Sequence, residues 1–377
     1  MRKGWEYKKL GDCTQILDSQ RKPVTKRDRK SGIYPYYGAT GIQDYVDKYI
    51  FDGRYVLVGE DGAKWSSFTQ SAFIIEGKTW VNNHAHVLRT NDFLVDSFLV
   101  YFLNYSDLDS YISGAIIRKL TQASLRNIDI PLPPKSTQLA IVSELDKINE
   151  LIRLKKEQLK DFDNLAQSLF YEMFGDPVEN EKGWEVKKLG EICEVTSAKR
   201  VFIDEVVESG VPFIRGTELT ALSKLVPGEK MDYTLFITYE HYERLKAITG
   251  VPKIGDLLIP SINADGIVWM VDTEDPLYFK DGRVLWVHVN HEYYNSIAIQ
   301  KLMNVLIKNV FTSMGGATFA ELKLFVLRNM NVPIPPLSVQ DAFSEKIKQI
   351  DAQKLQVKKS IQDLETLLAS RMQYWFE

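Results

Sequence analysis

The chain repeats its own beginning. The segment KGWEYKKLG at residues 3–11 returns as KGWEVKKLG at residues 182–190, with eight of nine positions identical at an offset of 179. A second pair is longer: LRNIDIPLPPKSTQLA at residues 125–140 returns as LRNMNVPIPPLSVQDA at residues 327–342, at an offset of 202. Internal self-similarity indicates repeated structural units. The chain therefore has the order A-B-A′-B′: A and A′ each begin with the first repeated segment, and B and B′ each follow the Pro-x-Pro-Pro of the second. The middle section, between the two repeated segments, is 23 residues longer in A′ than in A.

The B segments predict two long helices. Each follows a Pro-x-Pro-Pro stretch, which cannot continue a helix. We expect Ser136 and Ser338 to be the N-cap residues, and Asp341 to complete a capping-box-like pair with Ser338. The sequence GDP at residues 175–177 predicts the end of the first helix.

Apolar residues then recur at heptad spacing over about five heptads, which is typical of a coiled-coil seam. Lys155 interrupts the first seam, and Lys354 and Arg371 interrupt the second. The predicted helix–helix seam comprises Ile141, Leu145, Ile148, Ile152, Leu159, Phe162 and Leu169 in the first helix, and Phe343, Ile347, Ile350, Val357, Ile361, Leu364 and Leu368 in the second. We expect the two helices to pair with each other. The alternative is that each packs on its own domain as a long core helix.

The A segments mix strand-like and helical patterns. Residues 54–62, 71–89 and 281–290 predict strands and hairpins, whereas residues 96–108 and 295–310 have helical spacing. The pair Gly114–Ala115 matches Gly316–Ala317 at the second offset. The predicted fold class is therefore α+β, with two mixed α/β domains in tandem and each followed by a long helix. The expected boundaries are 1–135 for the first domain, 136–176 for the first helix, 177–337 for the second domain and 338–377 for the second helix.

Composition narrows the class of protein. Of 377 residues, 45% are apolar and 26% charged, as in ordinary soluble globular proteins. No apolar run approaches the roughly 20 residues that span a bilayer, and no apolar segment follows the basic start as in a signal peptide. Two cysteines, Cys13 and Cys193, do not make a disulfide framework. We therefore expect a cytoplasmic protein without membrane association.

The charge is unevenly distributed. Residues 1–135 hold 19 Lys and Arg against 15 Asp and Glu, a net +4, whereas residues 175–337 hold 17 against 22, a net −5. The whole chain has a net charge of −3. Contact with nucleic acid would therefore have to come from local basic loops.

The order and duplication of these motifs resemble the specificity (S) subunit of Type I restriction–modification enzymes. The resemblance covers the whole chain and rests on the two KGWE-x-KKLG segments, the two Pro-x-Pro-Pro-x-Ser-x-Gln segments with their heptad helices, and the loop phrases YYGATGI and VGEDGA. It implies that each globule is a target-recognition domain for one half of a split DNA sequence. It also implies that the two helices pair antiparallel, hold the globules apart and fix the length of the unread spacer.

The resemblance further implies the partners. The S subunit carries no active site and binds double-stranded DNA and two methyltransferase subunits, which modify an adenine in each half-site. Two motor–nuclease subunits complete the restriction enzyme. We expect no cofactor in this chain, with S-adenosylmethionine, ATP and Mg²⁺ held by the partner subunits. Antiparallel helices would relate the globules by a pseudo-twofold axis, and because the two middle sections differ, the target should be asymmetric and bipartite.

Candidate contacts in the first domain lie in five stretches. RKPVTKRDRK at residues 21–30 has the cations of a phosphate clamp, although such a run is also typical of a solvated loop. YPYYGATGIQ at residues 34–43 combines aromatic, glycine and hydroxyl groups, and residues 80–87 place Asn82, His84 and His86 on one face of a predicted strand, where Asn is a natural adenine reader. The candidates are Arg21, Lys22, Lys26, Arg27, Tyr37, Gly38, Thr40, Lys64, Asn82, His84, Arg118 and Lys119.

The second domain has fewer basic loops. Its candidates are Lys199, Arg200, Arg215, Thr217, Ser261, Asn263, Lys280, Arg283, Thr312 and Ser313. The sequence contains no G-x-x-x-x-G-K-[ST] phosphate loop, no G-x-G-x-x-G loop and no Asn/Asp-Pro-Pro-aromatic tetrad of amino-methyltransferases. The His-x-His pair has no evident third ligand, so we expect no metal. These observations disfavour a fused restriction enzyme. A coiled-coil protein–protein adaptor without DNA readout remains the alternative. Basic concave faces on both globules, on the same side of the paired helices, would favour DNA binding, whereas scattered charge would favour the adaptor.

Overall fold

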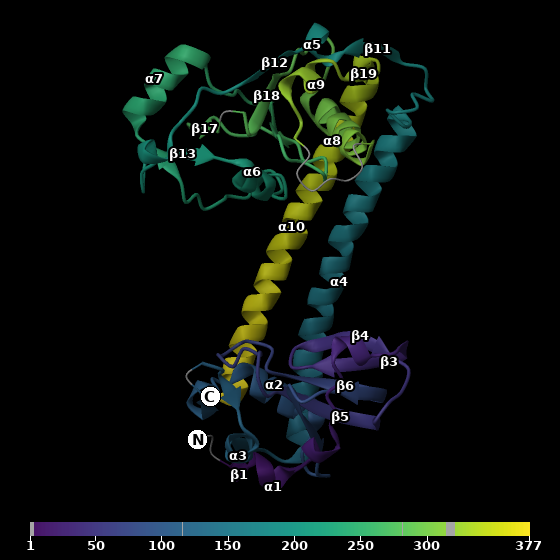
Figure 1. The fold of residues 1–377 in the computed structure, drawn as a ribbon, viewed down its shortest axis with the longest axis vertical. Coiled ribbons are helices and arrows are strands. Elements are labelled where there is room, and N and C mark those ends of the chain that lie inside the picture. Colours follow the sequence, from purple (N-terminus) through teal and green to yellow (C-terminus); the bar gives the residue numbers. More distant parts are fainter. Residues whose placement is uncertain (1–3, 115, 281, 314–320) are drawn as a thin grey trace. The chain divides into compact units, whose positions relative to one another are not determined.

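A computed structural model describes residues 4–114, 116–280, 282–313 and 321–377. Lys3, Ala115 and Gly316–Ala317 of the repeated motifs lie outside the described residues. The chain divides into two compact units (Figure 1): unit 1 comprises residues 1–154 and 360–377, and unit 2 comprises residues 155–359. Both long helices cross this division, so each helix contributes to the core of both units.

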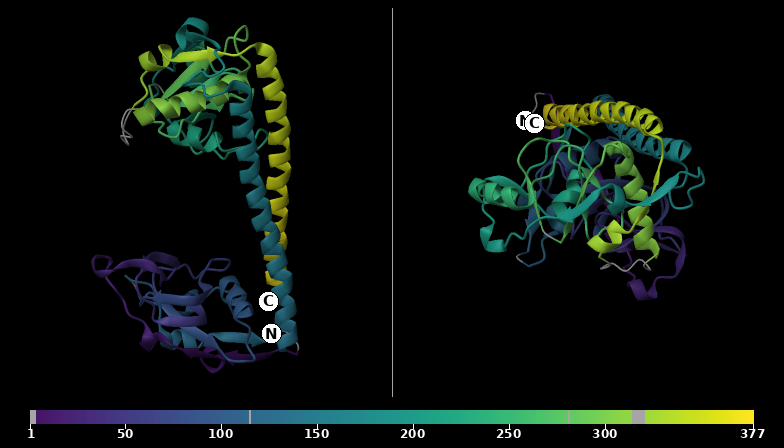
Figure 2. Two further views of the ribbon diagram at one scale, coloured as in Figure 1. Left: turned by 90° about the vertical axis from the view of Figure 1, so that its right-hand side faces the viewer. Right: turned by 90° about the horizontal axis from the view of Figure 1, so that it is seen from above.

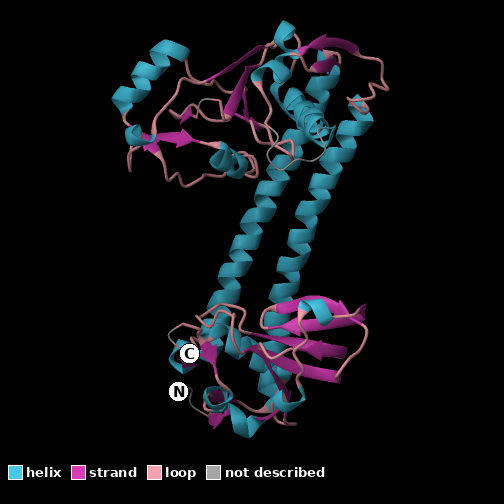
Figure 3. Cartoon of the chain, viewed as in Figure 1, coloured by secondary structure: helices cyan, strands magenta, loops and turns pink. Residues whose placement is uncertain are grey.

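Unit 1 is built around a six-stranded sheet of order β2-β7-β5-β6-β3-β4 (Figure 3). Strand β5 lies between β6 and β7 and is antiparallel to both. The strands predicted at residues 54–62 and 71–89 and the helix predicted at residues 96–108 are confirmed. The elements are β1 (Glu6–Lys9), α1 (Leu10–Cys13), β2 (Thr14–Ile16), η1 (Asp18–Gln20), η2 (Lys26–Asp28), β3 (Ser31–Gly38), β4 (Gly41–Val46), β5 (Phe51–Gly59), β6 (Ala72–Val81), β7 (Ala85–Thr90), α2 (Asp96–Tyr105), η3 (Asp109–Tyr111), β8 (Ile112–Ser113), β9 (Lys119–Leu120), α3 (Gln122–Arg126) and β10 (Asp129–Leu132).

Unit 2 has shorter strands, arranged as a four-stranded sheet of order β12-β18-β15-β16 and a three-stranded sheet of order β14-β13-β17. The predicted strand at residues 281–290 and the predicted helix at residues 295–310 are confirmed. The elements are β11 (Glu185–Lys188), α5 (Leu189–Ile192), β12 (Glu194–Ser197), η4 (Ile203–Glu205), β13 (Val211–Ile214), α6 (Gly216–Leu222), β14 (Phe236–Ile237), α7 (Tyr239–Thr249), β15 (Leu257–Pro260), β16 (Trp269–Met270), β17 (Tyr278–Phe279), β18 (Val284–His288), α8 (Ser296–Ser313), α9 (Leu324–Arg328) and β19 (Asn331–Ile334).

The repeated ends of each unit pair with each other. In unit 1, β1 and β10 form an antiparallel ribbon in which Lys9 lies opposite Asp129. In unit 2, β11 and β19 form the same ribbon, with Lys188 opposite Asn331. Both offsets of the repeat are preserved in these pairs, so the two ribbons have the same register. The repeated sequences therefore close a common frame, and the unlike middle sections fold within it.

A buried glutamine ties each frame to its long helix. The side chain of Gln138 accepts a hydrogen bond from the Val95 amide (2.9 Å) and donates to the carbonyl oxygens of Phe93 and Pro133 (both 2.9 Å). Gln340 makes the equivalent three bonds in unit 2, to the Asn295 amide and to the carbonyl oxygens of Tyr293 and Pro335, at 2.9, 2.9 and 2.7 Å. Both glutamines are fully buried. The Gln of the repeated Pro-x-Pro-Pro-x-Ser-x-Gln motif is therefore structural.

The repeated tryptophans also make structural contacts in both units. The Trp184 indole donates a hydrogen bond to the carbonyl oxygen of Phe174, the last residue of α4 (Lys135–Phe174), at 2.9 Å. The Trp5 ring lies edge-on to Phe98 of α2, with 6.4 Å between ring centroids. The residue after α4, Gly175, has a φ of +75°, which is a glycine conformation that ends helices. The predicted end of the first helix is confirmed.

The two long helices, α4 and α10 (Leu337–Phe376), pack together and run in opposite directions (Figures 1 and 2). In unit 1, Glu144 near the start of α4 pairs with Arg371 near the end of α10. In unit 2, Phe174 at the end of α4 lies 4.8 Å from Phe343 near the start of α10, measured between ring centroids. The predicted fold class is thus confirmed: two mixed α/β domains in tandem, with long helices that pack together.

Every predicted seam residue is buried or half-buried. The seam also contributes to the domain cores, because Ile141 and Leu145 belong to the core of unit 1, and Phe343 and Ile347 to that of unit 2. Pairing and domain packing therefore occur together, although they were expected as alternatives. Two of the three charged interruptions form ion pairs: Lys354 bonds to Asp163 at 2.6 Å, and Arg371 pairs with Glu144. Lys155 donates a hydrogen bond to the Gln158 side chain at 3.2 Å.

The predicted N-caps are wrong. The helices begin at Lys135 and Leu337, one residue before Ser136 and Ser338, so both serines lie inside the first turn. The amides of Thr137 and Val339 donate to the carbonyl oxygens of Pro134 and Pro336, at 2.8 and 2.9 Å. Pro134 and Pro336 are therefore the N-cap residues, because their carbonyl oxygens accept the first hydrogen bonds of the two helices. Asp341 forms no capping box. Its carboxylate accepts from the Asn295 side chain at 3.0 Å.

Candidate nucleic-acid interface

Loops far apart in the sequence of unit 1 meet at one place. The Glu60 amide donates to the carbonyl oxygen of His84 (2.9 Å), and the Asn82 amide donates to that of Tyr37 (3.0 Å). Asp61 forms a β-bridge with Lys119. We call the resulting group of residues 38–41, 59–66, 82–84, 113–114 and 116–119 the loop cluster. It contains seven predicted DNA contacts: Gly38, Thr40, Lys64, Asn82, His84, Arg118 and Lys119.

A buried ion-pair network anchors the loop cluster. One terminal nitrogen of Arg21 bonds to Glu60 at 2.5 Å, and the other lies 3.3 Å from Asp18. Lys119 bonds to the second oxygen of Glu60 at 2.6 Å. Burial opposes ionisation of Asp18 and Glu60, but hydrogen bonds from His86 to Asp18, and from Lys119 and Arg21 to Glu60, hold the pKa of each carboxyl below its usual value. The network joins four segments of the unit into one rigid base.

This network also includes the one group of possible metal ligands found among the described residues: Asp18, Glu60 and His86, with ligand atoms within 4.8 Å of one another. Both ring nitrogens of His86 face acceptors, Asp18 at 2.6 Å and the carbonyl oxygen of Leu120 at 2.7 Å. Arg21 and Lys119 already compensate the two carboxylates. The contacts of Asp18, Glu60 and His86 are therefore those of a buried ion-pair network.

Several predicted contacts in unit 1 lie elsewhere than expected. Asn82 and His84 form a turn and do not share a strand face with His86. Asn82 is 2% exposed and bonds to Gln43 at 3.2 Å, so the expected adenine reader is enclosed by its own loop. His84 is half-exposed and bonds to Asp61 at 2.5 Å. The strands at residues 71–89 are present, but the placement of Asn82 and His84 on a strand face was wrong, because the alternating sequence pattern continues through the short turn between β6 and β7.

Arg21 is a second correction. Its side chain is 12% exposed, and its guanidinium is occupied by Asp18, Glu60 and the carbonyl oxygen of Ala85 (2.8 Å). It therefore anchors the basic loop to the buried ion-pair network. Lys22, Lys26 and Arg27 of the same loop are exposed.

The YYGATGI loop divides into structural and exposed positions. Tyr37 is half-buried, and burial raises the pKa of its phenol. A Cβ at Gly38 would lie 2.2 Å from the Gln43 side-chain nitrogen, so a larger residue here would displace that side chain. Thr40, at the turn between β3 and β4, is exposed. Among these three predicted contacts, Thr40 is the one whose side chain faces solvent.

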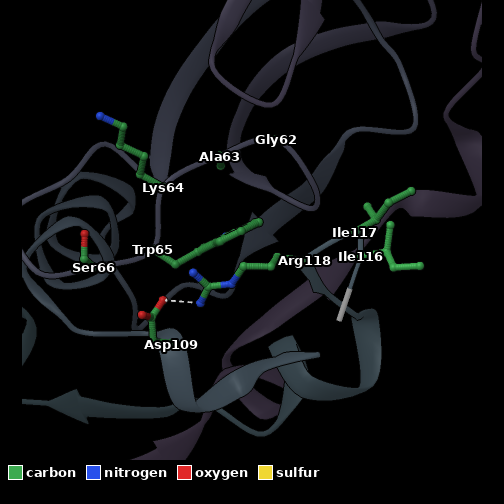
Figure 4. A pocket seen from close by; sticks show the side chains of 9 residues that line it. All are labelled: Gly62, Ala63, Lys64, Trp65, Ser66, Asp109, Ile116, Ile117 and Arg118. Carbon is green, nitrogen blue, oxygen red and sulfur yellow. Dashed lines mark hydrogen bonds and ion pairs between the residues drawn. The ribbon is translucent and has the colours of Figure 1, made fainter. Parts of the chain in front are cut away.

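A hollow of about 410 Å³ opens in the loop cluster (Figure 4). Lys64 and Arg118 line it, and Trp65 lies between them. Arg118 bonds to Asp109 at 2.8 Å and stands over the Trp65 ring at 6.0 Å from its centroid. Among the described residues, no carboxylate lies within ion-pair distance of Lys64, which is exposed. The hollow thus offers one unpaired and one paired cation beside an aromatic ring.

Unit 2 has two adjoining cavities, of about 390 and 360 Å³. Arg215, Thr217 and Ser261 line the first, and Arg200 lines the second. Lys280 and Arg283 line both. Six of the ten predicted contacts of this unit therefore meet around one basic region, which we call the basic cavities.

Arg215 is held in place by a buried carboxylate. Its guanidinium bonds to both oxygens of Glu218, at 2.9 and 3.1 Å, and its amide bonds to one of them at 3.1 Å. Thr217 donates to the same carboxylate at 3.0 Å. Burial opposes ionisation of Glu218, but these hydrogen bonds outweigh it and lower the pKa of the carboxyl to about 2. The Arg215 charge is therefore fixed in position and locally compensated.

The other predicted contacts of unit 2 lie outside the basic cavities. Asn263 is buried, and its side chain closes a turn by bonding the amide and carbonyl of Ile267. Thr312 and Ser313 donate to carbonyl oxygens one turn earlier in α8. Lys199 is exposed beside Arg200. Asn263 is therefore a structural residue of its loop.

Sequence reasoning missed the apolar residues of both regions. Ile116 is 97% and Ile117 69% exposed in the loop cluster, and Phe202 is 57% and Ile203 84% exposed at the basic cavities. Each pair stands next to cations in the sequence, as IIRK at residues 116–119 and KRVFI at residues 199–203. An apolar pair within two residues of a cation, outside any periodic pattern, was the available signal.

Among the described residues, no helix has both the length and the apolar character to cross a membrane.

Comparisons with known proteins agree with this architecture. A family model described as the Type I restriction modification DNA specificity domain matches twice, at residues 2–161 and 181–366. A putative type I restriction enzyme specificity subunit of Haemophilus influenzae is 32% identical over 342 residues, which cover 89% of this chain and 84% of that protein. The MjaVIII specificity subunit of Methanocaldococcus jannaschii is 23% identical over 375 residues, covering 92% of this chain and 86% of that protein.

Solved structures show the same fold. The S subunit of a Type I system from M. genitalium superposes with a TM-score of 0.57 at 15% identity, over 98% of this chain and 95% of that chain. A chain from a study of complex assembly and conformational transition of the type I R-M system gives 0.58 at 18% identity, over 100% and 98%. The duplicated frame, the paired helices and the double family match lead to one conclusion: the chain belongs to the Type I restriction–modification DNA specificity family.

Proposed function

We propose that this chain reads an asymmetric, bipartite DNA sequence, with each unit contacting one half-site. The observation that carries the proposal is the contrast between frame and loops. The ribbons β1–β10 and β11–β19 have one register, yet the frames enclose different surfaces, the loop cluster in unit 1 and the basic cavities in unit 2. Two equivalent frames with unlike contact surfaces suit a reader of two unlike half-sites.

The distribution of cations supports DNA as the partner. Lys64 and Arg118 gather in one hollow, and Arg200, Arg215, Lys280 and Arg283 gather around the other two cavities. The net charge of −3 gives no general attraction for phosphate, so these local groups would supply the contacts. A protein–protein adaptor would not require cations to converge in both units.

The chemistry would belong to partner subunits. In this proposal two methyltransferase subunits bind the chain and modify an adenine in each half-site with S-adenosylmethionine. Two motor–nuclease subunits, with ATP and Mg²⁺, restrict unmodified DNA. The specificity chain selects the site and orients the partners, and the helices α4 and α10 set the spacer between half-sites.

Mapping methylated adenines tests this function. The chain is co-expressed with its methyltransferase subunit in a host without adenine methylation, and the genome is sequenced for N6-methyladenine. We expect methylation in one split motif with two different halves and a constant gap. A continuous motif, or two identical halves, would contradict the proposal. Methyltransferase without this chain is the control and should leave the motif unmodified.

A further inference from the structure

The loop cluster presents two isoleucines to solvent at the tip of a hairpin. Strands β8 and β9 form a short antiparallel ribbon, in which Ser113 lies opposite Lys119. Ile116 and Ile117 lie in the turn and are 97% and 69% exposed. Exposure of two adjacent large apolar side chains is unfavourable in water unless a partner covers them.

The hairpin is firmly held at its base. The Leu120 amide donates to the Glu60 carbonyl oxygen at 2.8 Å, and the Lys119 ammonium bonds to the Glu60 carboxylate at 2.6 Å. Glu60 is itself part of the buried network with Arg21. At the tip, Gly114 has a φ of +95°, and a Cβ there would lie 2.1 Å from the Ile117 carbonyl oxygen. The tight turn therefore depends on glycine, and it presents the isoleucines on a fixed base.

Two cations line the hollow beside the apolar tip, and one of them, Arg118, is paired with Asp109. Arg118 follows the isoleucines directly, and Lys64 lies across the hollow that Ile116 and Ile117 help to line (Figure 4). Arg118 and Lys64 can approach phosphates on either side of a groove, whereas isoleucine gains nothing from a phosphate. A duplex groove can accommodate both the cations and the isoleucines, because its floor presents apolar groups between two rows of phosphates.

We infer that Ile116 and Ile117 are specificity-determining residues that contact thymine methyl groups in the major groove. The major groove admits a two-stranded β-ribbon, and thymine is the base that presents a methyl group there. The inference rests on the proposed function. That function also ensures a thymine in each half-site, opposite the adenine that is modified. The tip would reject cytosine, which has no such methyl group at the same position.

Unit 2 shows a similar arrangement at an unrelated position. Phe202 and Ile203 are exposed beside Arg200 and line the cavity that also contains Lys280 and Arg283. The Arg200 guanidinium stands 5.9 Å from the Phe202 ring centroid. An apolar pair next to a cation-lined cavity thus occurs in both units, although the surrounding loops differ.

The test compares cognate and unrelated duplexes. The chain is assembled with its methyltransferase subunits, and dissociation constants are measured at several salt concentrations. For Ile116→Ser/Ile117→Ser we expect at least about tenfold weaker binding to the cognate duplex, unchanged binding to the unrelated duplex and an unchanged salt slope. The matched control is Ile33→Ser, since Ile33 is a 79% exposed isoleucine of β3 in the same unit that does not line the hollow. It should behave as wild type.

Single replacements of thymine by deoxyuridine then remove one methyl group at a time. At least one replacement in the first half-site should weaken wild-type binding without further weakening the double variant. The inference is overturned if no position behaves in this way, if the double variant loses affinity equally for both duplexes, or if it loses its methyltransferase subunits instead. If wild type itself shows no preference for the cognate duplex, the proposed function fails and not merely this assignment.

Discussion

Gln138 and Gln340 occupy equivalent places in the two units, and each makes three hydrogen bonds to the backbone while fully buried. Replacing Gln340 with alanine leaves two carbonyls and one amide without these partners. Each lost bond costs about 0.5–1.5 kcal/mol, so we expect unit 2 to lose about 2–4 kcal/mol of unfolding free energy in urea. Gln362→Ala, at an exposed position of α10, is the control. Equal unfolding midpoints for the two variants would show that the hydrogen bonds of Gln340 do not stabilise unit 2.

Glu218 makes the stability of unit 2 depend on pH. Its folded pKa of about 2 lies below the ordinary value of 4.5, so its contribution is fully present above pH 5 and is lost as the pH falls from about 4.5 to 2. The difference corresponds to at most about 3 kcal/mol at neutral pH, and solvent screening of the Arg215–Glu218 pair reduces it. We expect Glu218→Gln to destabilise unit 2 at pH 7 and to lower the stability much less at pH 3, measured by urea unfolding at both values. An equal loss at both pH values would exclude this linkage.

Lys64 is the cation of the hollow without a carboxylate partner among the described residues. In the proposed complex it neutralises one phosphate, so Lys64→Gln should weaken binding to specific and unrelated DNA alike. The slope of log affinity against log salt should decrease in magnitude by about 1. Lys78→Gln, which removes an exposed lysine of β6 outside the loop cluster, should leave the slope unchanged. A loss confined to the cognate sequence would instead assign Lys64 to base readout.

Among the elements, the long helices depend on contacts with each other as well as with their domains. Phe343 of α10 is fully buried against Phe170 and Phe174 of α4, at 6.0 and 4.8 Å between ring centroids. Phe343→Ala should therefore cost about 3–5 kcal/mol of unfolding free energy in unit 2. Leu367→Ala changes a 45% exposed residue of the same helix and should cost far less. The comparison is made by thermal and urea unfolding, and similar losses would argue against a packed aromatic cluster.

The same elements show what sequence alone can predict. Helices α4 and α10 were recognisable because a heptad stripe is a local pattern. The ribbon β1–β10 was not, because Lys9 pairs with Asp129 across the whole middle section and no local pattern records such a pairing. For the same reason the sequence could nominate Arg21 and Asn82 as exposed contacts but could not reveal that Glu60 and Gln43 enclose them.

For the whole molecule, α4 and α10 are proposed to set the spacer of the target. Insertion of one heptad in each helix adds about 10 Å at 1.5 Å per residue, which corresponds to about three base pairs at 3.4 Å each. We expect the methylated motif to gain a spacer about three base pairs longer while both half-sites stay the same. Inserting seven residues in one helix alone should disrupt the pairing and abolish modification. A change in the half-sites would refute the role of the helices.

The equal register of the two ribbons has a consequence for how the domains can diverge. Each ribbon closes a loop, from Lys9 to Asp129 in unit 1 and from Lys188 to Asn331 in unit 2, and the second loop is 23 residues longer. The entropy of closing a loop grows only with the logarithm of its length, so the longer middle section costs only about 0.2 kcal/mol more to close. Insertions between the ribbon strands are therefore almost neutral for folding, and evolution can lengthen or replace the reading surface of either unit without redesigning the frame.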